Sequence, residues 1–339
     1  MGDTDSRSGL WSRFKSWFLG WQRGYFVPVG HAGWEWFIMR VLFAGLVWYT
    51  FQDFKPFTLG EMKRPTGIGR FIDLTFLSHQ VEEGGKTIRP WENIIRWTVL
   101  ASLVLYVTGF RLALLVSLTV LTLCSTMVRT LANSQTHTHH GYQIVTLTLL
   151  AQAMVIWYVY IWQWRNKRRF EPELHLGSYF IYYSQGLIAA TYVLAAITKI
   201  INSKGLWLWN ARYICIELIK SQRSMYYKGL PSKPGFDPAL AGDVTVAVWM
   251  LKHPLLTTLM FGAGFFLEVV ALIALRNRQW ALAIGLSIIA MHQMIMVMMK
   301  LTFHNNEILV LIFMVNVPFW IVWACRAGWR NEGLTQARD

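Results

Sequence analysis

The chain has 339 residues, of which 54% are hydrophobic and only 15% are charged. A soluble globular protein carries roughly a quarter charged residues, so this balance excludes the ordinary soluble class and indicates lipid as the solvent. The net charge of +14 is spread through the gaps between apolar segments. That distribution favours membrane topology over nucleic-acid binding. We therefore predict an all-α polytopic membrane helix bundle with no nucleic-acid partner.

Residues 1–30 are predicted to form a cytoplasmic amphipathic helix. Apolar and aromatic residues recur there at helical spacing from Leu10 to Tyr25, with basic residues among them. This pattern is typical of a helix that lies in the membrane interface. Its expected role is to anchor and orient the first span.

The segment 31–326 is predicted to be the transmembrane domain, with about eight spans. The spans run over 34–51, 94–108, 111–128, 142–163, 178–199, 255–275, 279–299 and 306–325. Two long outer loops are expected at 52–96 and 200–254, and a cytoplasmic tail at 327–339.

The excess of Lys and Arg in the short connections predicts that both termini are cytoplasmic. The segment 165–169 alone holds four basic residues, whereas the short outer connections hold only Arg129 and Lys300. In this orientation the polar residues considered next face the periplasm or a lumen.

Three histidines, His137, His139 and His140, fall within four residues before a long apolar helix. Ionisable groups at a lipid boundary are costly, and they often mark functional sites. Imidazoles bind metals or transfer protons near neutral pH, although this spacing matches no common zinc motif. The alternatives are a metal site, a catalytic or substrate-contacting histidine, for which His140 is favoured, and a solvated loop. Asn133 and Tyr142 are neighbouring candidates for ligand binding.

Lys199 ends the apolar segment 178–199. Its side chain either extends to the membrane surface or is desolvated enough to act as a base. Glu268 lies within the apolar run Phe265–Val270. We expect it to be paired or protonated inside the bundle, where it is a candidate binding residue.

A further set of candidates lies near the last span. His292 falls inside a predicted span and therefore needs a polar partner. Lys300, His304 and Glu307 are spaced at i, i+4 and i+7. On one continuous helix they would share a face, where they are candidate substrate-binding residues.

In their order along the chain, these features resemble the HTTM (horizontally transferred transmembrane) domain that is shared with vitamin K-dependent gamma-carboxylase. The resemblance covers roughly residues 25–325. It rests on Arg40, Gly109-Phe110-Arg111, Asn133 to Tyr142, Lys199, Lys204-Gly205-Leu206-Trp207-Leu208-Trp209, Pro254-Leu255-Leu256 before Glu268, His292 and a last span rich in Phe and Met.

The resemblance implies catalytic roles for three residues. Lys199 occupies the place of the lysine base that deprotonates reduced vitamin K, a quinone cofactor. His140 matches a functional histidine at the entrance of the fourth span. His292 or His304 matches a later histidine. The large luminal domain of true carboxylases has no counterpart after the last span, so a partner protein would supply an outer domain.

These expectations combine into an integral membrane enzyme, a carboxylase-like lyase or oxidoreductase in a bacterial inner membrane. It would act on a peptide or small molecule at the outer face and use a reduced quinone. One alternative is a non-catalytic binding or maturation factor for an apolar peptide or lipid. Another is a metal enzyme built on the histidine cluster.

Overall fold

The computed structural model describes residues 28–53, 81–83, 86–88, 90–134, 140–172, 174–216, 218–220, 245–299 and 301–325. Within these ranges the regular secondary structure is helical, apart from an antiparallel hairpin formed by β1 (Val81–Glu83) and β2 (Lys86–Ile88). All but the last three residues of the predicted interfacial helix 1–30 lie outside the described residues, as does the predicted tail 327–339.

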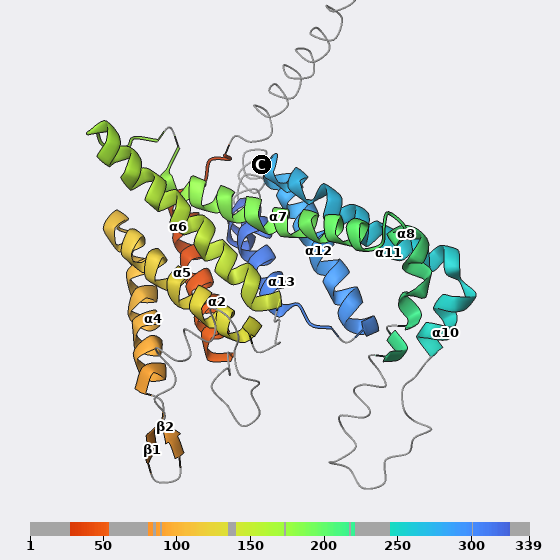
Figure 1. Cartoon of the computed structure of the whole chain (residues 1–339). Coiled ribbons are helices and arrows are strands. Elements are labelled where there is room, and N and C mark those ends of the chain that lie inside the picture. Colours follow the sequence, from red (N-terminus) through yellow and green to blue (C-terminus); the bar gives the residue numbers. More distant parts are fainter. Residues whose placement is uncertain are drawn as a thin grey trace, which may run out of the picture.

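The first helices along the chain pack in sequence order, each against the next (Figure 1). They are α2 (Gly33–Asp53), α4 (Pro90–Thr108), α5 (Arg111–Ser134) and α6 (His140–Asn166). Only two residues separate α4 from α5, and Gly109 makes this reversal with φ +78°. Positive φ is readily adopted only by glycine, so the turn depends on this residue.

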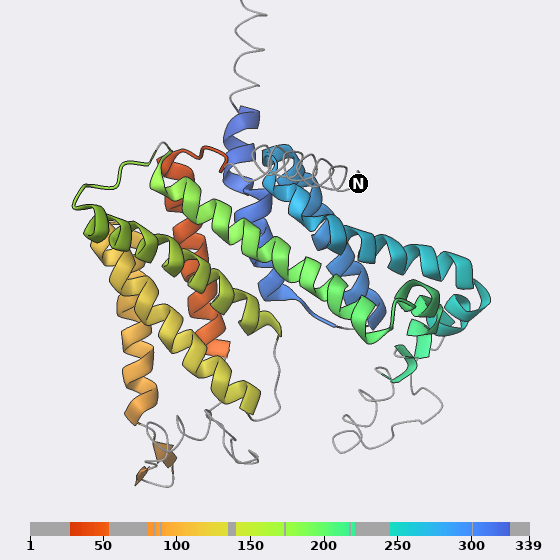
Figure 2. The same ribbon diagram turned by 45° about the horizontal axis from the view of Figure 1, so that its top comes forward.

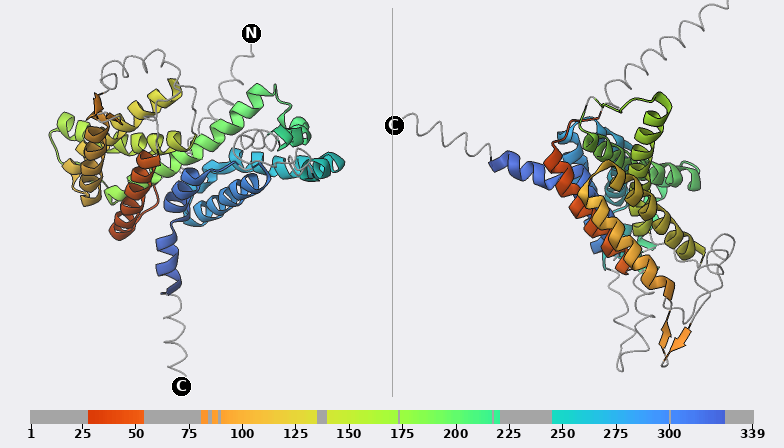
Figure 3. Two further views of the ribbon diagram at one scale, coloured as in Figure 1. Left: turned by 90° about the horizontal axis from the view of Figure 1, so that it is seen from below. Right: turned by 90° about the vertical axis from the view of Figure 1, so that its left-hand side faces the viewer.

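The second half of the molecule is joined to the first by α7 (Leu176–Asn202), which packs against α6 on one side and α11 on the other. Figures 2 and 3 show α7 running between the two groups of helices. The second group comprises α8 (Trp207–Asn210), η3 (Ala211–Tyr213), α10 (Thr245–Lys252), α11 (Pro254–Val270), η6 (Ala271–Leu275), α12 (Arg278–Met299), α13 (His304–Val310), η7 (Leu311–Val315) and the helix Val317–Cys325.

Five of the described helices are long and apolar enough to cross a membrane, and a sixth span is formed if the bent pair at the C-terminal end counts as one. Helices occupy all of the predicted spans, but the predicted count of about eight is not confirmed. The apolar helix 94–108 is shorter than a full span. Large apolar side chains such as Leu123, Met154 and Val297 are about two-thirds exposed. This surface is compatible with an integral membrane protein.

The predicted outer loop 200–254 contains helices in its described parts. α8, η3 and α10 pack against α11 around a small apolar cluster that includes Cys215 and Met250. This packing fixes the position of the chain that follows α7.

Asn316 bends the last apolar segment. It has a left-handed backbone with φ +51°, and the helices on either side meet at 42°. Pro318 lacks the backbone N–H that a continuous helix would use, which favours a break just before it. The Asn316 amide donates to Glu35 at 2.9 Å. The residue at the bend is thereby held at the start of α2.

Glu35 is the centre of a buried polar cluster that connects four parts of the fold. Arg278 donates to its two carboxylate oxygens at 3.0 and 3.1 Å, and His31 lies 2.9 Å from one of them. The His31 backbone N–H donates to Ser178 at the start of α7. A buried carboxylate satisfied in this way fixes the relative positions of α2, α7, α12 and the last helix.

Candidate functional site

Lys199 and Glu268 form an ion pair between α7 and α11. The Lys199 Nζ atom donates to both carboxylate oxygens of Glu268, each at 2.6 Å. The side chain of Glu268 is 8% exposed and that of Lys199 is 34% exposed. The carboxylate is therefore enclosed by the bundle, whereas about a third of the lysine side chain is exposed. The pairing provides the partner that a carboxylate in an apolar run requires.

The end of α7 determines what surrounds Lys199. The Gly205 N–H bonds to the carbonyl of Ile200 at 2.8 Å, and Lys204 has a positive φ of 54°. This is the Schellman arrangement, which ends a helix and reverses the chain. The reversal brings Trp207, at the start of α8, back over the lysine, with its ring centroid 5.1 Å from Nζ.

An aromatic wall adjoins the ion pair. Trp207 stacks on Phe265 of α11, with ring centroids 5.3 Å apart. Phe265 precedes Glu268 by three residues, so both side chains lie on the same side of α11. The ammonium group is thus held by a carboxylate and an aromatic face, and a cation–π contact of this kind is worth about 1 kcal/mol.

His292 lies buried on α12. Its Nε2 atom is 3.5 Å from the Tyr192 hydroxyl, at the outer limit for a hydrogen bond. Its ring stacks on Phe303 at 4.6 Å, and Nδ1 has no partner among the residues that the structure describes. His304 is exposed at the start of α13. Of the two histidines that sequence could not separate, only His292 is enclosed.

Tyr192 connects the ion pair to a second polar group. It lies on α7 seven residues before Lys199, which places both on one face of the helix. Its hydroxyl lies 3.5 Å from His292 on α12, the residue that precedes Gln293. Glu307 in turn accepts from the Gln293 side chain, with both oxygens at 2.9 Å. Ionisable and polar groups from α7, α11, α12 and α13 therefore meet in one region.

The continuous helix on which Lys300, His304 and Glu307 were expected to share a face is interrupted, and Lys300 itself lies outside the described residues. α12 ends at Met299, residues 301–303 are not helical, and α13 begins at His304. The i, i+4 relation applies only within a continuous helix, so the spacing of 300 and 304 no longer implies a shared face. Glu307 is buried whereas His304 is exposed, and the two side chains occupy different environments.

The histidine cluster falls outside what the structure describes. His137 and His139 lie between the described ranges, and nothing is established for the side chains of Asn133 and His140. The backbone of His140 begins α6, as the predicted helix entrance requires. Tyr142 is half-buried in the first turn of α6. Among the described residues, no three metal-binding side chains gather at one point.

Sequence reasoning missed two polar residues of the region around Lys199 and His292, namely Tyr192 and Gln293. The seven-residue spacing between Tyr192 and Lys199 is a signal that could have identified the tyrosine. Gln293 directly follows His292, but this adjacency in sequence does not indicate which group the Gln293 side chain contacts. Both residues contact groups on other helices, so their partners depend on how the helices pack.

Comparisons of the chain with known proteins add no further identification. No family model, no curated protein and no solved structure matches it. The resemblance to the HTTM domain therefore stays a prediction that rests on the residues quoted above.

Proposed function

We propose that this chain is an integral membrane enzyme of the HTTM, carboxylase-like type whose reactive group is the Lys199–Glu268 pair. One observation carries the proposal: the nitrogen of a partly exposed lysine side chain lies 2.6 Å from both oxygens of an enclosed carboxylate. A substrate that approaches Lys199 meets an amine with a proton acceptor already bonded to it. This arrangement is what a lysine base in an apolar environment needs.

The chemistry begins with proton transfer within the pair. The Lys199 ammonium gives one proton to the Glu268 carboxylate along the Nζ–Oε hydrogen bond, which leaves a neutral amine and a carboxylic acid. The neutral pair competes with the ion pair because the enclosed Glu268 carboxylate is costly to desolvate in its charged form. The free electron pair on Nζ could then accept a proton, which would leave a Lys199 ammonium beside protonated Glu268. A reduced quinone held beside Lys199 would supply the acidic hydroxyl that gives up this proton.

The surrounding groups support this role. Trp207 and Phe265 offer aromatic faces against which a quinone ring can stack. His292 and Tyr192 provide enclosed polar groups that can orient a developing anion. His140 keeps the catalytic role that the resemblance implies. The substrate is a peptide or small molecule.

The proposal includes the membrane arrangement. About eight spans place both termini in the cytoplasm and the Lys199 region toward the periplasm or a lumen. A partner protein supplies the outer domain that grips the substrate, and membrane lipid surrounds the bundle.

A second function is favoured by the same ion pair. A lysine held by a carboxylate and a tryptophan ring carries its charge and is not a base in that state. The chain would then be a non-catalytic binding or maturation factor for an apolar peptide or lipid. In that case the pair simply joins α7 to α11.

Mass spectrometry of the molecules that co-purify with the gently extracted protein tests the proposal. Wild type is compared with Lys199→Ala, Glu268→Gln and the control Lys252→Ala, which removes an exposed lysine. The enzyme proposal expects a chemically altered quinone or peptide in wild type and in the control. Both site variants should retain only unaltered molecules.

Recovery of the same unaltered peptide or lipid from all four proteins would refute the enzyme proposal and support the binding factor. Altered product from Glu268→Gln but not from Lys199→Ala would assign the base to lysine alone. Metal at about one atom per chain in the same samples would return the histidine cluster to consideration.

A further inference from the structure

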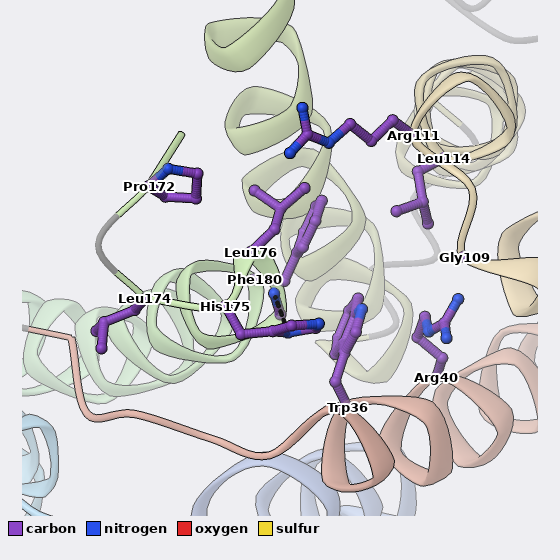
Figure 4. Close-up of a pocket in the computed structure, with 12 residues that line it drawn as sticks. Trp36, Arg40, Gly109, Arg111, Leu114, Pro172, Leu174, His175, Leu176 and Phe180 are labelled. Atoms are coloured by element: carbon purple, nitrogen blue, oxygen red, sulfur yellow. Dashed lines mark hydrogen bonds between the residues drawn. The ribbon is translucent and has the colours of Figure 1, made fainter. Parts of the chain in front are cut away.

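A cavity of about 470 Å³ lies at the far end of α7 from Lys199. Its lining includes Gly177, which is 22 residues from Lys199 along α7, or about 33 Å at the rise of an α-helix. The cavity is bounded by the starts of α2, α5 and α7 and by the segment before α7 (Figure 4). It is therefore separate from the candidate site described above.

Two arginines face this cavity, and none of the described residues that line it is acidic. Arg40 is only 7% exposed, and its Nε atom has no hydrogen-bond partner among the described residues. Its NH1 atom donates to the Tyr106 carbonyl at a long 3.3 Å. Arg111 contributes a second guanidinium, which makes a 3.4 Å contact with the Phe170 carbonyl. A buried guanidinium with an unused donor, and with no carboxylate among its described neighbours, has room for an anionic ligand.

The backbone is shaped so that Arg40 can occupy this place. A Cβ atom on Gly109 would stand 1.9 Å from the Arg40 NH1 atom. A Cβ atom on Gly177 would stand 2.6 Å from the Trp36 ring, over which the Arg40 guanidinium lies at 5.5 Å. The absence of side chains at both positions leaves the space that the guanidinium and the indole fill.

Further groups at the cavity also favour negative charge. Both α5 and α7 begin at the cavity, and the N-terminus of a helix attracts negative charge. The His175 Nδ1 atom accepts a hydrogen bond from the Gly177 N–H at 3.1 Å. The neutral His175 ring therefore carries its proton on Nε2, a further donor on the ring that Figure 4 shows beside Trp36.

We propose that this cavity binds the phosphate group of a phosphate ester, with Arg40 and Arg111 as its two charged ligands. Guanidinium groups match the oxygens of a phosphate in geometry and charge. The stacked rings of Trp36 and Phe180, 5.0 Å apart, form an apolar wall for the organic part of the ester. The volume suits a small organic molecule or headgroup more than a bare ion. The ester is either a phospholipid or a soluble phosphate monoester.

Two probes distinguish the sources. Full-length protein is delipidated in dodecyl maltoside, titrated with glycerol 3-phosphate by calorimetry, and separately mixed with phosphatidic acid for native mass spectrometry. Diacylglycerol, which lacks the phosphate, and sodium chloride at matched ionic strength serve as ligand controls. The protein variants are Arg40→Gln, Arg111→Gln and the control Arg168→Gln, which removes an exposed charge outside the lining.

The expected result is binding of one probe that weakens about tenfold or more in either lining variant and is unchanged in Arg168→Gln. Glycerol 3-phosphate binding identifies a soluble ester, whereas retention of phosphatidic acid alone identifies a lipid. If Arg40→Gln does not fold, Arg111→Gln and Arg111→Lys carry the test, because Arg111 is only half-buried. Binding of neither probe, equal binding of diacylglycerol or chloride, or wild-type affinity in Arg111→Gln would each overturn the proposal.

Discussion

Lys199 and Glu268 are 69 residues apart in sequence, yet the lysine nitrogen lies 2.6 Å from both oxygens of the carboxylate. The two ends of this ion pair differ in exposure, because Glu268 is enclosed and Lys199 is not. A charge that loses its partner can reach water only if its side chain is long and near the surface. Removal of Lys199 and removal of Glu268 should therefore lower the stability of the protein by different amounts.

Lys199→Ala is expected to destabilise the protein by about 3 kcal/mol or more, because it leaves Glu268 buried without a partner. Glu268→Gln should cost about 1 kcal/mol, because Lys199 can still extend toward the surface. Thermal unfolding of both variants in one detergent measures the difference. The double variant should be close to Glu268→Gln alone. Equal losses in the two single variants would contradict this asymmetry.

Gly109→Ala is expected to destabilise the protein much more than Gly205→Ala. Both glycines have a positive φ, 78° and 82°, so both alanines carry a backbone cost of about 1 kcal/mol. Only at Gly109 would the new Cβ meet another group, the Arg40 guanidinium, whereas nothing lies within 4 Å at Gly205. Because the backbone cost is common to both variants, the difference between their unfolding midpoints measures the effect of the contact with Arg40. Similar midpoints would show that Arg40 moves away freely.

Arg278→Ala is expected to cost about 3 kcal/mol, because it removes the charged partner of buried Glu35. His31 and Asn316 would still hold the carboxylate, but neither supplies a fixed positive charge. Arg165→Ala, which removes an exposed arginine, serves as the control and should change stability by less than about 0.5 kcal/mol. Denaturation of both variants in the same detergent gives the comparison, and a small effect at Arg278 would mean that the cluster repacks.

His292→Phe separates a structural role from a functional one. The imidazole is buried, its contact with Tyr192 is long, and its Nδ1 atom has no described partner. An apolar ring of similar size should therefore fold with a change in stability of less than about 1 kcal/mol. The proposed activity should be lost. The same preparation provides both readouts, the unfolding midpoint and the mass of the co-purified molecule. Retained chemistry in this variant would remove His292 from the catalytic set.

The all-helical class of the fold and the positions of its helices were readable from sequence. An apolar segment can be recognised from a short stretch of sequence, because a segment in lipid must satisfy its backbone hydrogen bonds within its own helix. The same segments appear as α5, α6, α7, α11 with η6, and α12, which meet the length and composition of spans. Lys199, Glu268 and His292 stood out because ionisable groups in such segments are rare.

Which of these groups meet was decided by the tertiary structure. The distance from Lys199 to Glu268 depends on how α7 and α11 are rotated and crossed, and side-chain packing along both helices sets those angles. No local window of sequence contains that information. The same holds for Glu35 and Arg278, which are 243 residues apart.

The helix break between Met299 and His304 shows why sequence periodicity alone does not establish which residues share a face. A periodic pattern predicted one face for Lys300, His304 and Glu307, but the periodicity applies only while the helix continues. In the folded chain Phe303 leaves the helical path and stacks on His292, and Glu307 turns inward to Gln293. The sequence determined which residues were able to carry chemistry, and the packing of distant helices determined which of them lie together, because contacts between helices form only when the whole bundle is assembled.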